Sequence, residues 1–588
     1  MPIGEDLSTW RHWWDFNQDR FLPFESGKVA QTGSDDFYLG ATRTRSASAA
    51  SVDANRVHDE VLPALRRAIE AGPSDVTANG LIALARVGVD HRDWRITDVI
   101  AARLGDGDQR VRETAALALG LAGHTDGRRR MQLIAVLRDD AGGRALVGHA
   151  VSDRTRSFAA YGLGLLASRT DKNATKRAVF EALADVLLDE TVVARDVRVA
   201  ALQAIGLLDI DRKSYRGARL TQEVLATLET FFAADRGVGE QQVQAHCPTA
   251  IARMLDRDDP GAERHKERFA AILEGKGLDG RKTRRRVQHA VAQSCALALG
   301  QLVRPNEDGD ASKDRDVRFS EVLRATWKSH KDAQTRSFAV LALGQIGGAD
   351  NREFLLKAVD RASRNLEQPW CALALGLCAE QRQQRTGAVD TFAAETLMRC
   401  FDRAKNPEAV GAFAIALGLA GCDASRGKLA KALPRNVGKD VAPGAICQAL
   451  SMLDANASQV ELRKALDKCD RRPELYEEAT RALGRLGDAE IAEALLQRLV
   501  RGEANYEMQL ALATALSDVG GAAQVAPLVE VVRDASRSAV TRAGAARALG
   551  GIVDRKPIRW NTLLRENANY RAAVATLTDG NRGVLDLR

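Results

Sequence analysis

Residues 275–286 hold the densest group of side chains in the chain that could bind an anion. Five cations fall within six positions there: Arg281, Lys282, Arg284, Arg285 and Arg286. A Gly-x-Gly-x-x-Gly precedes them at 275–280, but it follows a predicted helix rather than a strand, and Arg281 separates it from the Lys-Thr pair that a phosphate loop requires. Two interpretations stay open: a turn that binds nucleic acid or another polyanion, and a solvated loop.

Other patterns that could support chemistry are incomplete. Asn306, Asp308 and Asp310 have the spacing of a calcium loop, but Ala311 replaces the required Gly and Val317 the terminal Glu. No nucleophile motif and no pair of catalytic carboxylates stands out. All eight cysteines lie in the middle of the chain and never as Cys-x-x-Cys, which favours buried, reduced thiols. We therefore expect no metal, no cofactor and no catalytic site.

Charge is balanced overall and uneven locally. The formal charge of +7 is the difference between 85 basic and 78 acidic side chains, so most charge is expected on a solvated, mixed surface. Residues 262–290 are net basic and residues 1–60 net acidic. The chain has no predicted signal peptide and no run of 18 apolar residues, which predicts a cytoplasmic protein without membrane insertion.

The elements that must position these residues follow from a repeated phrase, a small residue, then Leu or Ile, then Gly. It occurs nine times, ending at Gly120, Gly164, Gly206, Gly300, Gly344, Gly376, Gly418, Gly484 and Gly550. Ser451 and Ser517 end two further copies, which makes the spacing a regular 33 residues from about 418, whereas it is 42–48 through much of the first half. Weaker copies at Leu84-Ala85 and Ile251-Ala252 bring the number of units to thirteen. Such self-similarity is typical of a repeat protein.

Each phrase lies near the end of an apolar helical pattern, and a second helical pattern precedes it. Examples of this first helix are 61–69, 175–188, 316–327, 491–500 and 525–532. Prolines at 369, 407, 443 and 473 fall at or near the starts of second helices, where a missing N–H costs little. Since Gly costs about 1 kcal/mol in a helix relative to Ala, its recurrence indicates that a neighbouring helix passes too close for a Cβ. The class predicted is all-α.

An Arg recurs eight residues before the Gly that ends the phrase, with an Asp upstream of most copies. The residues are Asp108 and Arg112, Asp153 and Arg156, Asp196 and Arg198, Asp332 and Arg336, and Arg542. This pattern resembles that of HEAT repeats. The resemblance implies a right-handed α-solenoid of about thirteen helix pairs, in which these side chains form a ladder between units and cap the second helix.

The two ends depart from the repeat. Trp10, Trp13 and Trp14 lie on one face of a predicted helix, and Asn-Tyr-Arg-Ala stands at 569–572. These ends resemble those of a family of large bacterial HEAT-repeat proteins without assigned function. We predict a Trp-rich capping segment (1–40), a linker (41–52), the solenoid (53–556) and a C-terminal capping motif (557–588). The tryptophans are interpreted as a cap of the first repeat or as an anchor for a partner.

HEAT-like folds also include enzymes. A di-iron hydroxylase of this type needs His-Glu pairs, and none of the nine histidines is followed by Glu. A lyase or glycosylase of HEAT-like type remains a minor alternative. The leading hypothesis is a non-enzymatic scaffold that binds a protein or peptide along the concave surface of the solenoid. Binding of nucleic acid or another polyanion through residues 275–286 is the second hypothesis.

Overall fold

The phrases found in the sequence lie in helices, near their C-terminal ends in most copies. The computed structural model of the chain describes residues 7–23, 52–123, 127–191, 194–282, 287–309, 315–361, 367–469, 471–502, 505–554, 560–579, 582–585 and 587. Helices make up most of these residues, and no strand occurs among them. Each helix that carries a phrase packs against the first helix of its own repeat, as an αα-hairpin repeat requires.

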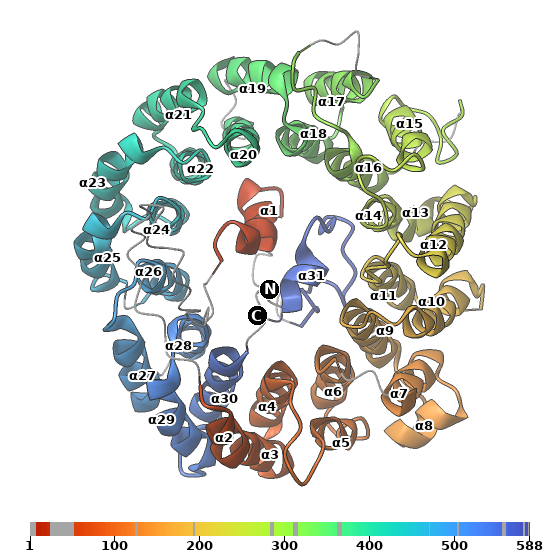
Figure 1. Cartoon of the computed structure of the whole chain (residues 1–588), viewed down its shortest axis with the longest axis vertical. Helices are drawn as coiled ribbons and strands as arrows, with labels where there is room; N and C mark the ends of the chain where they lie inside the picture. Colours follow the sequence, from red (N-terminus) through yellow and green to blue (C-terminus); the bar gives the residue numbers. More distant parts are fainter. Residues whose placement is uncertain are drawn as a thin grey trace, which may run out of the picture. The chain divides into compact units, whose positions relative to one another are not determined.

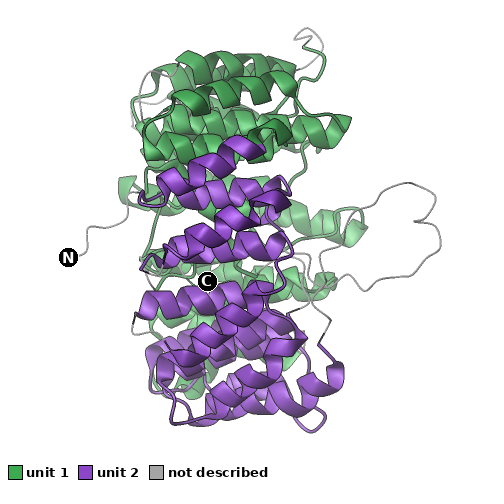
Figure 2. Ribbon diagram, turned by 90° about the vertical axis from the view of Figure 1, so that its left-hand side faces the viewer, with its two compact units in different colours: residues 1–18, 123–425, 560–588 green, residues 19–122, 426–559 purple. Residues whose placement is uncertain are grey.

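The repeats fall into two compact units (Figure 2). Unit 1 comprises Met1–Gln18, Gly123–Ser425 and Trp560–Arg588, and unit 2 comprises Asp19–Ala122 and Arg426–Arg559. Seven helix pairs lie in the described part of unit 1 and six in that of unit 2. The prediction of an all-α solenoid of about thirteen HEAT-like helix pairs is confirmed.

In unit 1 the second helices line the inner, concave side and the first helices the outer side (Figure 1). The first helices are α7 (Gly127–Arg138), α10 (Asn173–Leu188), α12 (Tyr215–Ala233), α15 (Ala262–Leu273), α17 (Val317–Ser329), α19 (Ala349–Arg361) and α21 (Thr391–Arg403). The second helices are α9 (Asp153–Ser168), α11 (Arg195–Ile205), α14 (Cys247–Arg253), α16 (His289–Leu302), α18 (Ala333–Ile346), α20 (Gln368–Thr386) and α22 (Pro407–Leu419). Also in this unit are α1 (Trp10–Asn17), α8 (Ala141–Val147), η3 (Val238–Glu240), α13 (Gln241–Gln244), η4 (Asp423–Ser425) and α31 (Trp560–Arg565).

Unit 2 is built in the same way from two separate stretches of chain. Its first helices are α3 (Leu62–Ala71), α5 (Ile96–Ala101), α23 (Arg426–Asn436), α25 (Gln459–Leu466), α27 (Ile491–Arg501) and α29 (Ala522–Arg533). The second helices are α4 (Ser74–Val87), α6 (Gln109–Leu121), α24 (Ala442–Met452), α26 (Pro473–Arg485), α28 (Tyr506–Val519) and α30 (Ala539–Val553). Short turns are α2 (Ala54–Arg56), the π-turn η2 (Val57–Val61) and η5 (Asn456–Ser458), while η1 (Gln18–Arg20) follows α1.

The recurring glycines lie where second helices of successive repeats pack together. A Cβ built on each of several glycines would fall 2.6–3.0 Å from the Cα of the alanine that opens the next phrase, which is closer than backbone allows. These pairs are Gly164 with Ala204, Gly300 with Ala342, Gly344 with Ala374, and Gly376 with Ala416. The predicted role of the glycine, close approach of a neighbouring helix, agrees with this geometry.

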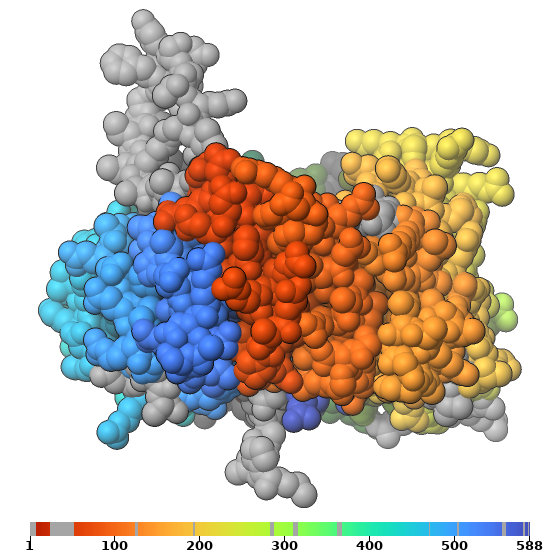
Figure 3. Space-filling view, turned by 90° about the horizontal axis from the view of Figure 1, so that it is seen from below, coloured from red at the N-terminus to blue at the C-terminus, as the bar shows by residue number. Residues whose placement is uncertain are grey.

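One such contact joins the two ends of the repeat series inside unit 2. A Cβ on Gly550 of α30 would lie 2.6 Å from the Cα of Ala83 in α4, the first second helix of the chain. Arg86 of α4 donates to Asp554 at 3.0 Å and to Ser517 at 3.2 Å. Figure 3 shows the red surface of the first repeat directly beside the blue surface of the last. We call this α4–α30 contact the seam.

Candidate functional site

The concave side of unit 1 is occupied by the chain's own C-terminal segment. Residues 566–579 and 582–585, which follow α31, form turns and irregular structure rather than a regular helix and lie inside the curve of second helices (Figure 1). Tyr570, Ala572 and Leu577 have no exposed surface. The segment is therefore built into unit 1 and does not merely cover it.

Side chains from successive repeats hold the backbone of this segment. The Asp196 carboxylate accepts from the Thr576 N–H at 2.7 Å, and Gln242 donates to the Ala573 carbonyl at 3.4 Å. Arg253 donates to the carbonyl of Glu566, and Arg154 to that of Arg582. Several repeats thus hold this irregular segment through its main chain.

Two asparagines of the segment add side-chain contacts to second helices farther along the repeat series. Asn569 donates to the Ala290 carbonyl at 2.9 Å and to the Ser294 hydroxyl at 2.7 Å. Gln345 donates to the Asn567 side chain at 3.0 Å. The segment thus runs from α18 towards α9, opposite to the order of the repeats.

One histidine, His246, hydrogen-bonds to both this segment and a neighbouring repeat. Its Nε2 donates to the Ala572 carbonyl at 2.8 Å, and its Nδ1 accepts from the Gln203 amide at 2.9 Å. The ring is fully buried. Burial lowers the pKa of His246 to about 4, although the bond to Ala572 acts in the opposite direction. The ring is therefore neutral at pH 7, with both nitrogens satisfied, and serves as a fixed bridge between repeats and segment.

The predicted tryptophan cluster also lies in unit 1. Trp10, Trp13 and Trp14 are at most 2% exposed, and their helix α1 packs on α20 and α31. The first repeat, α3 and α4, belongs to unit 2 instead. Buried indoles are not available as an anchor for an external partner. Residues 24–51, which include the predicted linker apart from Val52, lie outside the described part of the chain.

The two terminal motifs contact each other. The Asn17 side chain accepts from the Asn567 N–H at 3.0 Å, and the Phe16 ring meets the Tyr570 ring edge-on at 5.4 Å. Tyr570 packs in the same way on Phe338 of α18, at 5.7 Å. The residues that carry the family resemblance of the two ends thus form one cluster.

The predicted ladder arginines bond to the backbone at or beyond the end of the first helix of their own repeat. Each donates at 2.6–3.1 Å to a carbonyl there. In four of the five pairs this satisfies an acceptor in the last turn or at the C-cap of the helix, whereas Asp106 lies beyond the end of α5. The pairs are Arg112 with Asp106, Arg156 with Leu137, Arg198 with Asp189, Arg336 with His330, and Arg542 with Val532. Arg198 and Arg336 also reach acidic residues of the next repeat, Glu240 at 2.9 Å and Glu367 at 3.3 Å.

The acidic residues of the predicted ladder have two different roles, as helix caps and as ion-pair partners. Asp108 and Asp332 cap the second helices α6 and α18 by accepting from backbone N–H groups. Asp153 pairs with Arg156 at 3.1 Å, while the cap of its helix is Ser152. The ladder residues are thus engaged in helix ends and repeat contacts.

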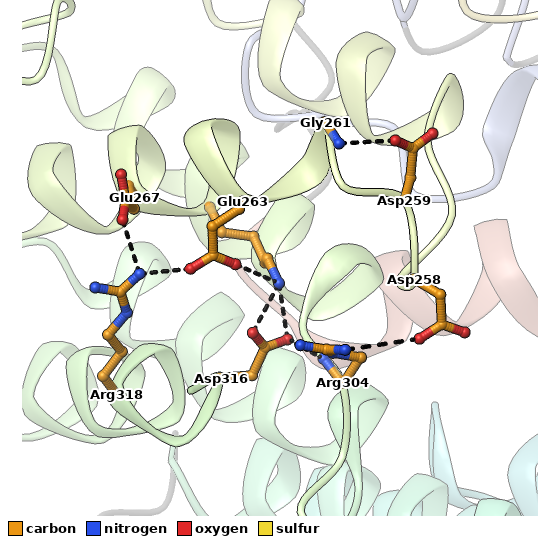
Figure 4. A network of polar contacts seen from close by, with 9 residues as sticks. Asp258, Asp259, Gly261, Glu263, Glu267, Arg304, Asp316 and Arg318 are labelled. Carbon is orange, nitrogen blue, oxygen red and sulfur yellow. Dashed lines mark hydrogen bonds and ion pairs between the residues drawn. The ribbon is translucent and has the colours of Figure 1, made fainter. Parts of the chain in front are cut away.

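A buried ion network lies between α15 and α17 (Figure 4). The Lys266 ammonium is 2.7 and 2.8 Å from the two oxygens of Asp316 and 3.0 Å from Glu263. Burial alone would raise the pKa of Asp316, but bonds from Lys266 and the Arg304 N–H outweigh it and hold that pKa below its usual range. With three oxygens around its ammonium, Lys266 is a structural clamp rather than a nucleophile.

The predicted anion-binding turn is described only in part. Arg281 and Lys282 are exposed, and the Arg281 N–H bonds to Asp279 at 2.9 Å. Arg284, Arg285 and Arg286 lie outside the described residues. The turn follows α15 in the outer layer of unit 1. Its role as a polyanion site stays a prediction.

A second basic region, which sequence analysis missed, forms a groove in unit 2. Helices α23 and α25 and the loop at 454–458 enclose a volume of about 720 Å³. Its lining includes four cations, Arg426, Lys431, Arg435 and Lys464, and two carboxylates, Asp454 and Glu461. The signal was in the sequence, because residues 426–439 contain five Lys or Arg and no Asp or Glu. We call this feature the basic groove.

Three further properties concern only the part of the chain that the structure describes. No group of three or more His, Cys, Asp or Glu side chains is arranged there to hold a metal ion. All eight cysteines are buried and form no disulfide. No helix described by the structure combines the length and apolarity needed to cross a bilayer.

Comparison with known proteins identifies the repeat and little else. A family model of HEAT repeats matches residues 460–550, which lie within the regular 33-residue units. No curated protein matches the sequence.

Solved structures that resemble the chain do so at low identity. Crystal structures of Kap121p and of importin beta have TM-scores of 0.36 and 0.35 at 11% and 13% identity, with 84% and 83% of this chain covered. An engineered protein has a TM-score of 0.24 at 16% identity, with 84% of this chain covered and 98% of its own. The chain spans about half the length of Kap121p (53%) and 68% of the importin beta chain.

Proposed function

We propose that this protein is a non-enzymatic scaffold that binds a protein or peptide partner. The observation that carries the proposal is the C-terminal segment on the concave side of unit 1. Side chains from neighbouring repeats, which are far in sequence from the segment, hold its backbone at Glu566, Ala573 and Thr576. Repeated helix pairs suit the binding of a polypeptide segment, because each repeat places side chains at an equivalent position along one extended surface.

The location of an external partner follows from the same observation. A ligand on the concave side of unit 1 has to displace residues whose side chains are fully buried, such as Tyr570 and Asn569. Displacement of these residues exposes apolar area, which costs a free energy of about 25 cal/mol per Å², and it leaves polar groups that are now buried without hydrogen-bond partners. We therefore place the partner on exposed surfaces of the first helices and their loops rather than along this concave face.

Cross-linking of the full-length chain to proteins that it captures tests the proposal. Mass spectrometry of the cross-linked peptides should identify protein partners and place the contacts on exposed lysines of first helices and loops. Capture no greater than with a matched globular control protein, or capture that is lost on nuclease treatment, contradicts the scaffold function.

The second candidate is polyanion binding through residues 275–286, favoured by the exposure of Arg281 and Lys282. If four of its five cations contacted duplex phosphates, the logarithmic salt slope of binding would be about −3.6. Replacement of Arg284, Arg285 and Arg286 by Ala should then abolish most binding to DNA, RNA or heparin and leave thermal unfolding unchanged. Absence of salt-sensitive association in the native protein rejects this candidate.

A further inference from the structure

The basic groove differs from much of the outer layer of unit 1 in the ion pairs between its neighbouring first helices. Along much of the outer layer of unit 1, ion pairs link neighbouring first helices. Examples are Arg177 of α10 with Glu223 of α12 at 2.6 Å, and Arg399 of α21 with Asp360 of α19 at 2.7 Å. Between α23 and α25, which are also neighbours, no ion pair joins described side chains. An open groove lies there instead.

Three cations of the groove have no carboxylate within 4.0 Å among the described residues. They are Lys431 and Arg435 on α23 and Lys464 on α25. Lys431 and Arg435 lie one helical turn apart and are exposed. Charged groups around a concave surface raise the local concentration of ligands of opposite charge. The groove therefore attracts an anionic ligand.

The uncharged part of the lining indicates which anion fits. It includes small residues, among them Gly427, Ala430, Pro434 and Ala455. Pro434 lies inside α23 and has no N–H to donate to the carbonyl of Ala430 one turn earlier. The groove thus combines small uncharged residues, a backbone carbonyl that lacks its usual helical donor, and exposed cations, which are the complements of a peptide backbone with acidic side chains.

The dimensions set the length of the ligand. From residue 427 to residue 435 the helix rises about 12 Å, which matches roughly four residues of extended chain. Lys431 and Arg435 are separated by a rise of about 6 Å, close to the distance of about 6.6 Å between side chains i and i+2 on one face of a strand. Two carboxylates separated by one residue therefore meet both cations.

We infer that the basic groove binds a short acidic segment of a partner protein, in extended conformation and with carboxylates at positions i and i+2. This inference rests on the proposed scaffold function and names the partner chemistry of one of its surfaces. Asp454 and Glu461 in the lining favour a peptide, whose N–H groups can donate to carboxylates, over a phosphodiester chain, whose backbone has no such donor.

Gly427 offers a substitution that blocks the groove without strain. It lines the groove, and a Cβ built on it meets no atom within 4 Å. Gly427→Trp should therefore fill the groove while the fold is kept. Gly438 is equally open but does not line the groove, so Gly438→Trp is the matched control. Lys439→Glu with Lys468→Glu is the matched control for charge, because neither residue lines the groove.

Fluorescence anisotropy with the full-length chain tests the inference. The probe is a fluorescein-labelled Gly/Ser peptide with a central Glu-Ala-Glu, compared with the same peptide carrying Gln-Ala-Gln. We expect the acidic peptide to bind at least about tenfold more tightly, as loss of two charge-assisted contacts predicts. Gly427→Trp, and separately Lys431→Glu with Arg435→Glu, should weaken binding by about tenfold or more. Both controls should bind like the native chain.

Several outcomes overturn the inference. They are equal binding of the two peptides, unchanged binding by both groove variants, or competition by a short oligothymidylate as strong as that by the acidic peptide. If Gly427→Trp fails to fold, as judged by circular dichroism, the charge-reversal variant decides. Partners captured equally by the native chain and by Gly427→Trp refute the groove site but leave the scaffold function standing. Failure to capture any protein refutes the scaffold function itself.

Discussion

Single glycines decide how closely the repeats stack. In the Gly344–Ala374 pair, the added Cβ meets backbone rather than the flexible end of a side chain, at 2.6 Å from the Ala374 Cα. Backbone in a packed helix cannot move aside cheaply, since interiors are packed like crystals. The same residue type on α23, Gly427, meets nothing within 4 Å. A larger side chain should therefore destabilise the fold at Gly344 and not at Gly427, although both glycines lie in helices.

We expect Gly344→Leu to lower the free energy of unfolding by roughly 1–3 kcal/mol or more, because the larger side chain overpacks the contact between α18 and α20. Gly427→Leu is the control and should be neutral or slightly stabilising, since Gly is unfavourable in a helix. Denaturant titration of both variants measures the difference. Equal free energies of unfolding for the two variants would show that the close approach of α18 and α20 is not the reason for a glycine at position 344.

The buried Lys266–Asp316 pair gives a second prediction for single residues. Asp316→Asn removes the nearer of two carboxylates around an ammonium that is 2% exposed. Loss of one member of a buried pair costs about 3–5 kcal/mol, and because Glu263 remains at 3.0 Å we expect the lower end of that range. Asp185→Asn, which breaks the exposed pair with Arg138, should cost less than about 1 kcal/mol. Thermal and denaturant unfolding at pH 7 compare the two.

The pH dependence of this variant has a definite sign. The folded pKa of Asp316 lies below its ordinary value of about 4, so its ionised form stabilises the fold above that pH. The contribution is lost as pH falls from about 4 through the folded pKa. The difference between native chain and Asp316→Asn should therefore shrink below about pH 4. A constant difference down to the lowest pH that permits folding contradicts the assignment.

At the scale of helices, local pattern predicted most of the fold. The first helices expected at 491–500 and 525–532 are α27 (Ile491–Arg501) and α29 (Ala522–Arg533), and prolines expected at the starts of second helices lie in the first turns of α20, α22, α24 and α26. These features are local, because apolar spacing, caps and proline constraints act within one or two turns.

Contacts between elements far apart in sequence were not predictable in this way. Nothing in the Trp10–Trp14 region indicates that Asn17 and Phe16 meet Asn567 and Tyr570, because an aromatic cluster fits any apolar surface. The basic groove was missed for another reason. Its cations come from α23 and α25, and only the packing of these helices shows that Lys431 and Lys464 line one groove.

The link between the C-terminal segment and the repeats should depend on pH through His246. With a folded pKa of about 4 against about 6.5 when unfolded, neutral His246 stabilises the fold above pH 6.5, and this contribution is lost as pH falls towards 4. The full shift corresponds to about 3 kcal/mol. His246→Gln cannot titrate, so its melting temperature should improve relative to that of the native chain across this window. A pH-independent difference contradicts the proposed neutral bridge.

At the scale of the molecule, the repeats of unit 2 pack in an order that differs from their order along the chain. In unit 2 the second helices pack in the order α24, α26, α28, α30, α4 and α6, so the last repeat is followed by the first. The Gly550–Ala83 contact has the same geometry as Gly376–Ala416 between successive repeats. The seam therefore uses the ordinary repeat interface, and neither α30 nor α4 presents an uncovered apolar face there.

This arrangement predicts that a change in the last repeat is transmitted to the first. Gly550→Leu should overpack α4, because the added Cβ already lies 2.6 Å from the Ala83 Cα. Hydrogen exchange measured by mass spectrometry should become faster in α4 as well as in α30, although the two are far apart in sequence. In an open-ended solenoid, the same substitution would change exchange in α28 and α30 and leave α4 unchanged. Since Gly427→Leu meets no neighbour, its exchange in α4 should match that of the native chain, which separates opening of the seam from a general loss of stability.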